Sequence, residues 1–175
     1  MGIDQQIACP AGTYGARTRL MVVSECIDCP PGVLCNRPAL TEANITQTDF
    51  LCPKGKYCLT RTLAPTDCPA GTYRDITGGR FEADCFPCPI SNYCPKGAVS
   101  PILCKASMHC PAKSAYFKTC RGGYYCNSLT NMTEKVCPMN NYCPRRSSLP
   151  IKCDGRFICS EGSELPLVCE AGTIV

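Results

Sequence analysis

The segment CPKGKYC, residues 52–58, has a cysteine at each end, and its spacing recurs along the chain. Six further copies are CPPGVLC (29–35), CPISNYC (88–94), CKASMHC (104–110), CRGGYYC (120–126), CPMNNYC (137–143) and CDGRFIC (153–159). Three relatives lack the second cysteine: CPAGTYG (9–15), CPAGTYR (68–74) and CEAGTIV (169–175). We call each of these segments a cysteine phrase. Because their period is mostly 16 or 17 residues, they predict an array in which each unit contacts its neighbours.

Turn residues occupy fixed places in the cysteine phrases. Proline often follows the first cysteine, and glycine often stands three residues after it, as in Pro53 and Gly55. Proline fixes φ near −65° and glycine accepts positive φ, so each phrase is predicted to form a tight turn. A bulky residue stands five places after the first cysteine, and we expect it to lie half-buried over a neighbouring disulfide. This packing position holds Tyr57, Tyr93, Tyr125 and Tyr142, and also His109, the only histidine, for which a ligand role is the alternative.

The composition favours disulfides over a hydrophobic core. Leu, Ile, Val and Phe make up 33 of the 175 residues, tryptophan is absent, and cysteine occurs 19 times. Such a cysteine content is typical of disulfide scaffolds in an oxidising compartment. The longest aliphatic run, 20–23, is far too short for a membrane span. The net charge of +4 is spread along the chain, with its densest spot at Arg145–Arg146, so a nucleic-acid partner is not expected.

A longer period is superimposed on the short one. The phrases at 9 and 68 each run on to a C-x-x-C, and the phrase at 169 begins in the same way. We therefore expect a lead-in at 1–8, a first large repeat at 9–67, a second at 68–168 with extra C-x5-C units, and the start of a third at 169–175. The interrupted repeats predict end-to-end contacts, with the longer polypeptide or an identical chain, that bury Ile3, Ile7, Ile174 and Val175.

Two stretches carry a resemblance to a known family. Residues 9–32, CPAGTYGARTRLMVVSECIDCPPG, and 68–91, CPAGTYRDITGGRFEADCFPCPIS, contain C-x-x-G-T-Y followed by C-x-x-C-P-x-G, with Ser91 replacing the last glycine. This pattern resembles the ephrin-receptor-like cysteine-rich repeat. The C-x5-C phrases are similar to modules of tumour-necrosis-factor receptors and to repeat proteins on protist and algal surfaces. The resemblance implies extracellular modules that stack end to end and have no active site.

Spacing alone leaves the disulfide pairing open. The resemblance to the receptor modules implies Cys9–Cys26 and Cys68–Cys85, with successive phrases joined crosswise. The crosswise bridges would be Cys29–Cys52, Cys35–Cys58, Cys88–Cys104, Cys94–Cys110, Cys120–Cys137, Cys126–Cys143 and Cys153–Cys169. In that scheme Cys159 has no mate within the chain.

Metal binding and catalysis are the alternatives to a structural array. Cys26/Cys29 and Cys85/Cys88 have C-x-x-C spacing, but 59 residues separate the two pairs, unlike a zinc ribbon. A redox role would need a strand-to-helix context that neither pair has. The carboxylates are scattered, and Gly78–Gly79 lacks the rest of a phosphate-binding loop. We therefore expect no enzyme, no metal and no cofactor.

The sequence also predicts covalent glycans. Asn44 (NIT) and Asn131 (NMT) stand in N-x-T acceptor motifs between cysteine phrases, where loops face water.

The sequence predicts small disulfide-rich repeats in an elongated rod or solenoid. We expect mostly loops and turns with short antiparallel β-hairpins and almost no helix. The favoured function is a secreted structural protein that builds an extended glycosylated fibre or surface appendage. The alternative is the stalk or ligand-binding module of a cell-surface receptor.

Overall fold

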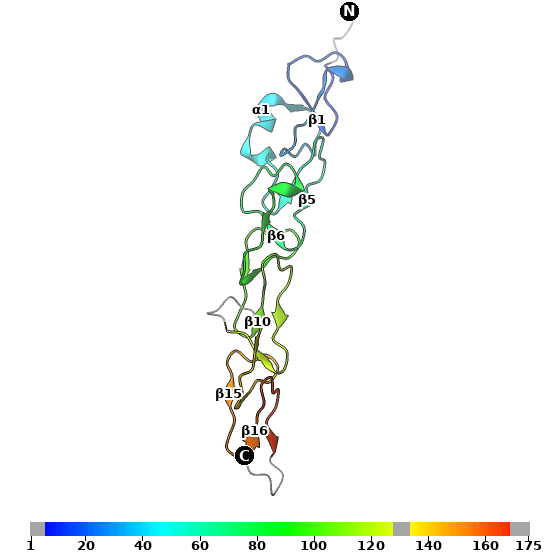
Figure 1. Cartoon of the computed structure of the whole chain (residues 1–175). Helices are drawn as coiled ribbons and strands as arrows, with labels where there is room; N and C mark the ends of the chain where they lie inside the picture. The colour runs from blue at the N-terminus through cyan, green and yellow to red at the C-terminus, as the bar shows by residue number, and fades with distance from the viewer. Residues whose placement is uncertain (1–5, 128–133, 169–175) are drawn as a thin grey trace, which may run out of the picture. The chain divides into compact units, whose positions relative to one another are not determined.

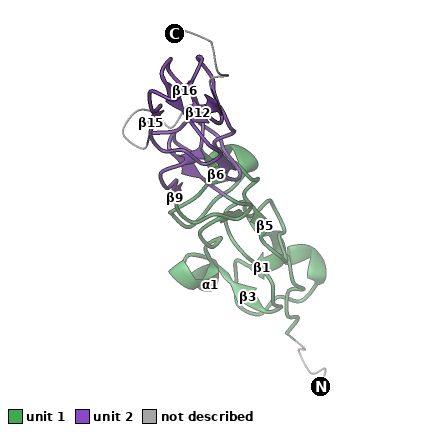
Figure 2. Ribbon diagram, turned by 90° about the horizontal axis from the view of Figure 1, so that it is seen from below, with its two compact units in different colours: residues 1–87, 95–100 green, residues 88–94, 101–175 purple. Residues whose placement is uncertain are grey.

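The computed structural model describes residues 6–127 and 134–168. The chain divides into two compact units, residues 1–87 with 95–100 and residues 88–94 with 101–175, coloured separately in Figure 2. The units are defined by contacts between residues, whereas the large repeats at 9–67 and 68–168 are defined by the sequence pattern.

One hairpin rule governs both units (Figure 1). The two residues before the second cysteine of a phrase, or before its equivalent, pair antiparallel with the two residues before the next phrase. Unit 1 has β1 (Thr13–Gly15) with β2 (Ile27–Asp28), β4 (Lys56–Tyr57) with β5 (Thr66–Asp67) and β6 (Thr72–Tyr73) with β7 (Phe86–Pro87). Unit 2 has β8 (Asn92–Tyr93) with β9 (Ile102–Leu103), β10 (Met108–His109) with β11 (Lys118–Thr119), β12 (Tyr124–Tyr125) with β13 (Lys135–Val136), β14 (Asn141–Tyr142) with β15 (Ile151–Lys152) and β16 (Phe157–Ile158) with β17 (Leu167–Val168).

In residues 6–127 and 134–168, helical structure is confined to short segments of unit 1. These segments are α1 (Glu42–Ile45) and the 3-10 turns η1 (Val23–Glu25), η2 (Thr48–Phe50) and η3 (Glu82–Asp84). Near α1, β3 (Leu40–Thr41) runs parallel to β1 and completes a three-stranded sheet in the order β2-β1-β3. A small core of Val33, Leu40, Ile45 and Phe50 with Cys29 and Cys35 lies here, and Tyr14 packs against it. The predicted fold class of small disulfide-rich repeats with short hairpins and almost no helix is confirmed for the described residues.

The disulfides differ from the predicted crosswise scheme. Cys9–Cys26 and Cys68–Cys85 close the opening loops, as the resemblance implies. Each C-x5-C phrase, however, bonds to itself: Cys29–Cys35, Cys52–Cys58, Cys88–Cys94, Cys104–Cys110, Cys120–Cys126, Cys137–Cys143 and Cys153–Cys159. The prediction was therefore wrong for Cys29–Cys52, Cys35–Cys58, Cys88–Cys104, Cys94–Cys110, Cys120–Cys137, Cys126–Cys143 and Cys153–Cys169. It was also wrong for Cys159, which bonds to Cys153.

The turn inside each phrase explains the local pairing. In the phrase at 137, for example, the Asn141 N–H donates to the Pro138 carbonyl at 3.1 Å, and Asn140 between them has φ 62°. The chain therefore reverses within the phrase and brings its two cysteines together. The Cα atoms of Cys137 and Cys143 are 5.9 Å apart, within the usual range for a disulfide. Cys169 lies outside the described residues.

Neighbouring phrases are joined by backbone hydrogen bonds in a repeated register. The residue three places after the first cysteine donates to the second cysteine of the next phrase and accepts from its first cysteine. In unit 1 the Gly32 N–H donates to the Cys58 carbonyl at 2.8 Å, and the Cys52 N–H donates to Gly32 at 2.8 Å. In unit 2 Gly123 makes the same pair of bonds with Cys143 and Cys137, at 2.8 and 2.9 Å. Within each unit, the backbone bonds therefore repeat from one phrase to the next.

At the packing position, the predicted half-burial is found for all five residues named above, and the predicted contact with a neighbouring disulfide is found for Tyr93. Tyr57, Tyr93, Tyr125, Tyr142 and His109 are all half-buried. Tyr93 packs against the Cys104 and Cys110 pair, which belongs to the next phrase. The structure adds a partner across the hairpin, because Tyr93 also lies opposite Ile102 and makes an edge contact with Phe117 at 5.5 Å between ring centroids. The phrase at 88–94 thus shares a small apolar core with the phrase at 104–110.

Candidate functional site: the openings of the two large repeats

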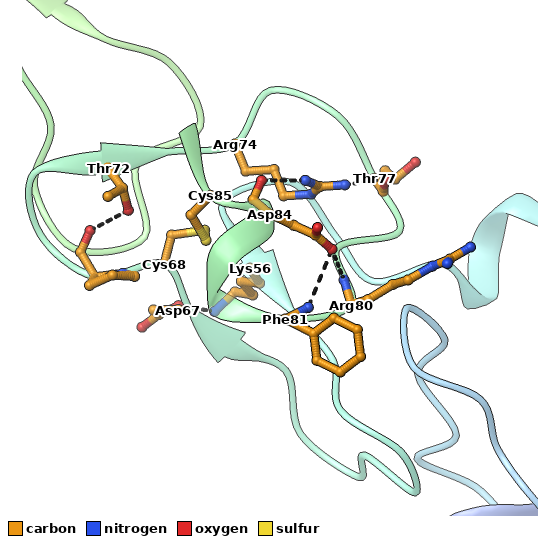
Figure 3. The surroundings of a disulfide bond; sticks show 11 residues. Lys56, Asp67, Cys68, Thr72, Arg74, Thr77, Arg80, Phe81, Asp84 and Cys85 are labelled. Atoms are coloured by element: carbon orange, nitrogen blue, oxygen red, sulfur yellow. Dashed lines mark hydrogen bonds and ion pairs between the residues drawn. A yellow bond between two sulfur atoms is a disulfide. The ribbon is translucent and has the colours of Figure 1, made fainter. Parts of the chain in front are cut away.

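The opening of the second large repeat is a loop closed by the Cys68–Cys85 disulfide (Figure 3). Cys68 is fully buried. At the far side of the loop, Asp84 Oδ2 accepts hydrogen bonds from the backbone N–H groups of Arg80, at 2.7 Å, and Phe81, at 3.3 Å. These two bonds hold the pKa of Asp84 below its usual value, with the bond from Arg80 the larger cause. The carboxylate therefore fixes the start of η3, which leads into Cys85.

Arg74 is buried inside this loop, with 6% of its surface exposed. It occupies the place where C-x5-C phrases have their second cysteine. Its Nη1 donates to the Asp84 carbonyl at 2.5 Å and its Nη2 to the Thr77 carbonyl at 3.4 Å, as Figure 3 shows. The Nε atom has no hydrogen-bond partner among the described residues. The guanidinium therefore connects two sides of the loop, while its stem fills the interior.

The first large repeat fills the same interior differently. Gly15 stands at the position of Arg74, and Leu20 at the position of Gly79. Leu20 is buried, and its Cδ1 would lie 2.9 Å from a Cβ added at Gly15. In the second repeat a Cβ added at Gly79 would lie 2.8 Å from Arg74 Nε. The large and small side chains have exchanged positions between the two repeats. The interior is filled by Leu20 in the first loop and by Arg74 in the second.

Both openings have an acidic side chain that accepts backbone N–H groups just before the closing cysteine. Glu25 Oε2 accepts from the backbone N–H groups of Met21, at 2.8 Å, and Val22, at 3.2 Å. The bond from Met21 is the larger cause of a lowered pKa at Glu25. Glu25 stands one residue before Cys26, as Asp84 does before Cys85. An acid before the closing cysteine is therefore part of the loop's construction.

The preceding phrase covers the opening of the second large repeat. Gly78 N–H donates to the Cys52 carbonyl at 2.7 Å, and Cys58 N–H donates to the Gly79 carbonyl at 2.9 Å. A third bond joins the Gly55 N–H to the Arg74 carbonyl at 2.8 Å. The phrase at 52–58 therefore lies directly on the loop of residues 74–80.

An ion pair stands at the side of this contact. Lys56 Nζ lies 2.5 Å from Asp67 Oδ1, and both side chains are about one-third exposed. The hydrogen bond from Lys56 is the main cause of the lowered pKa of Asp67. The pair links the two strands β4 and β5, immediately before Cys68.

An open groove occupies the corresponding surface of the first large repeat. Its volume is about 530 Å³, and its lining includes Ile7, Gly15, Arg19, Leu20 and Leu40. The Ile7 N–H donates to the Leu20 carbonyl at 2.9 Å. This bond is the counterpart of the one from the Cys58 N–H to the Gly79 carbonyl in the second repeat. The groove therefore corresponds to the surface that the phrase at 52–58 covers in the second repeat.

The residues considered as metal ligands from the sequence lie in a hairpin strand or in disulfides. His109 lies in β10 opposite Lys118 and is half-buried. The C-x-x-C cysteines do not pair with each other, since Cys26 and Cys29 belong to different disulfides, as do Cys85 and Cys88. Among residues 6–127 and 134–168, no group of three or more His, Cys, Asp or Glu side chains is placed to hold a metal ion.

The acceptor motif at Asn44 lies in α1. Asn44 Oδ1 accepts hydrogen bonds from the Thr41 backbone N–H, at 3.0 Å, and from the Thr41 hydroxyl, at 2.9 Å. Both bonds use the amide oxygen. The amide nitrogen, the atom to which an N-linked sugar would attach, has no partner in the described part of the chain. Thr46 is exposed. Asn131, the second predicted acceptor, lies outside the described residues.

Sequence reasoning missed the buried Arg74 and the groove. The signal for Arg74 was its place, since it stands where the C-x5-C phrases have a bonded and buried cysteine. The groove had no signal beyond the place of the phrase at 9 in the array. Of the residues expected to be buried in end-to-end contacts, Ile7 lines the groove, and Ile3, Ile174 and Val175 lie outside the described residues.

No protein-family model matches the chain, and no curated protein sequence matches it at a significant level. In the described residues, no helix has both the length and the apolar character that a membrane span requires.

Proposed function

We propose that this chain is a structural repeat protein that builds an extended extracellular fibre or cell-surface appendage. The observation that carries the proposal is the repeated backbone register, in which each phrase offers the same N–H and carbonyl groups to the next. A phrase with such a register can be added to the array without changing the other phrases, so the array can be built to different lengths. The resemblance to extracellular repeats that stack end to end supports the same function.

The disulfides support the proposed location. The described residues contain nine disulfides, and the buried core consists largely of their cysteines. Disulfides of this density form and persist in oxidising compartments. We propose that the protein is secreted or lies on the cell surface. We also propose that it associates with other copies of itself.

Asn44 is the proposed glycan site within the described residues. Its amide oxygen is held by Thr41, so a sugar on the nitrogen leaves the start of α1 intact. Chain secreted by eukaryotic cells is expected to lose mass on enzymatic removal of N-glycans. Asn44→Gln should remove one glycan unit, and Thr46→Ser, which keeps the acceptor motif, should retain it. An unchanged mass in Asn44→Gln would refute this site.

Electron microscopy of the secreted chain tests the fibre directly. We expect filaments or end-to-end rows whose length grows with protein concentration. Sedimentation velocity over the same concentrations should show the matching increase in mass. Monodisperse single chains at all concentrations would contradict the proposal.

A receptor stalk or ligand-binding module is the second candidate. The observation that favours it is the pair of opening disulfides, Cys9–Cys26 and Cys68–Cys85, since the resemblance to receptor modules implies both. Single chains by microscopy, together with saturable binding to a cell surface, would support the receptor.

A further inference from the structure

The longest stretch of the chain without an acidic residue is 85–133, between Asp84 and Glu134. Basic residues are spread along the whole sequence, but acidic residues are not. The acid-free stretch contains Lys96, Lys105, Lys113, Lys118 and Arg121. A surface built from this stretch therefore carries positive charge with few carboxylates to neutralise it.

The loop between β10 and β11 forms an open hollow within this stretch and within unit 2. Its volume is about 310 Å³, and it is lined by residues 111–116 and 118. Lys113, Tyr116 and Lys118 are exposed members of this lining. The structure describes all eight tyrosines, and Tyr116 is 67% exposed whereas the other seven are half-buried. Tyr116 therefore presents its ring to solvent beside two ammonium groups.

Lys113 lacks the acidic partner that the equivalent residue of unit 1 has. Lys113 and Arg61 each stand three residues after the second cysteine of their phrase, with φ 62° and 60°. Each backbone N–H donates to the first cysteine of the preceding phrase, at 2.8 and 3.0 Å. Arg61 pairs with Asp28, which stands immediately before that cysteine, at 3.4 Å. The corresponding residue for Lys113 is Pro87. In the described residues, neither Lys113 nor Lys118 makes an ion pair with a carboxylate.

Hydrogen bonds hold the backbone of the hollow in place. The Ser114 carbonyl accepts from the Cys94 N–H at 2.9 Å, and the Ser114 hydroxyl donates to the Pro111 carbonyl at 2.6 Å. The bond from the Lys113 N–H to the Cys88 carbonyl fixes the same turn. A ligand therefore meets a formed surface and does not have to order the loop, which lowers the cost of binding.

We propose that the hollow at Lys113, Tyr116 and Lys118 binds an acidic polysaccharide. The C–H groups on the face of a sugar ring carry partial positive charge, so they stack on the negative face of the Tyr116 ring. Sulfate or carboxylate groups on the same sugar chain accept charge-assisted hydrogen bonds from the two lysines. This inference goes beyond the proposed fibre, because a single chain carries the whole hollow.

Three dextrans that share one sugar backbone test the proposal: neutral dextran, carboxymethyl dextran and dextran sulfate. Their affinities for the secreted chain are measured by titration calorimetry at about 0.15 M salt, where distant charges are largely screened. We expect both charged dextrans to bind and the neutral one to show no binding. Replacing Lys113 and Lys118 together by glutamine should weaken binding about tenfold or more, because two charge-assisted contacts are removed. Tyr116→Ala should weaken it about fivefold, and Tyr116→Phe, which keeps the ring, should not.

The matched control removes the same charge elsewhere in unit 2. Lys135 and Lys152 are exposed lysines in β13 and β15, and their joint replacement by glutamine should change the affinity by less than about twofold, as for exposed charges outside a site. A loss equal to that of the double variant in the hollow would show attraction by net charge alone and overturn the site. Equal affinity for single-stranded DNA, or an unchanged affinity in Tyr116→Ala, would overturn the assignment to a sugar. Absence of binding to both charged dextrans would overturn the proposal as a whole.

Discussion

Gly123 is the position where a single methyl group tests the register between phrases. Gly123 has φ 80°, and a Cβ built there overlaps the carbonyl oxygen of Gly162. The Gly162 N–H is itself bonded to the Cys137 carbonyl at 2.8 Å, so this backbone cannot retreat without breaking a bond. Gly123→Ala therefore combines two costs, a left-handed conformation for alanine and a backbone collision.

The magnitude follows from these two terms. The left-handed conformation costs a residue with a Cβ roughly 1–2 kcal/mol. Overpacking against a fixed neighbour adds about 1–3 kcal/mol. We expect Gly123→Ala to lower the free energy of unfolding by about 2–5 kcal/mol in total. Ser91, Ser107 and Asn140 adopt positive φ at the same place in their phrases. The conformation alone is therefore tolerated, and the collision decides the size of the effect.

Urea unfolding with the disulfides intact measures the effect, followed by tyrosine fluorescence because the chain has no tryptophan. Native-state hydrogen exchange adds a local reading at the Cys137 amide, which donates to the Gly123 carbonyl. The control is Gly155→Ala, since a Cβ there meets nothing within 4 Å. It should change stability by no more than about 1 kcal/mol. If both variants match in stability and in exchange at Cys137, the close approach does not hold the phrases together.

Three further predictions concern the loops and bridges. Arg74→Met, which keeps the length of the stem, should be more stable in urea than Arg74→Ala by about 1–3 kcal/mol; equal losses would mean that the guanidinium bonds hold the loop. The lowered pKa of Asp84 adds stability that is present above its unfolded pKa and is lost as the pH falls through the lower folded value. Asp84→Asn should therefore reduce the loss of stability between pH 5 and 2. An unchanged dependence of stability on pH would contradict this. Replacing both Cys104 and Cys110 by serine should cost about 2 kcal/mol of loop entropy, with peptide mapping showing every other bridge retained; reshuffled bridges would show that local pairing depends on the whole array.

The repeat, the turn and the packing position were predictable because each is local. Proline and a residue with positive φ decide the turn within seven residues, and the turn decides where Tyr93 points. The crosswise bridges failed for the same reason. The prediction placed Cys29 and Cys52 together on the strength of a family resemblance, whereas the turn brings Cys29 and Cys35 within reach first.

The features that escaped prediction depend on contacts between a phrase and residues outside it. Arg74 is buried because Gly79, five residues away, leaves room for it, and Leu20 is buried because Gly15 does. Such exchanges appear only when the two large repeats are compared in space. The groove likewise depends on which phrase covers which loop, and the hydrogen bonds between phrases decide that.

Self-closing phrases have a consequence for how the chain matures. In the described residues no bridge spans more than 17 positions, and each C-x5-C bridge spans only 6. A phrase that enters an oxidising lumen during synthesis therefore already carries its own partner and can be oxidised before the next phrase is translated. Contacts of such short range favour rapid, sequential folding. Maturation can thus proceed from the amino end, and the chance of mispairing need not grow with the number of cysteines.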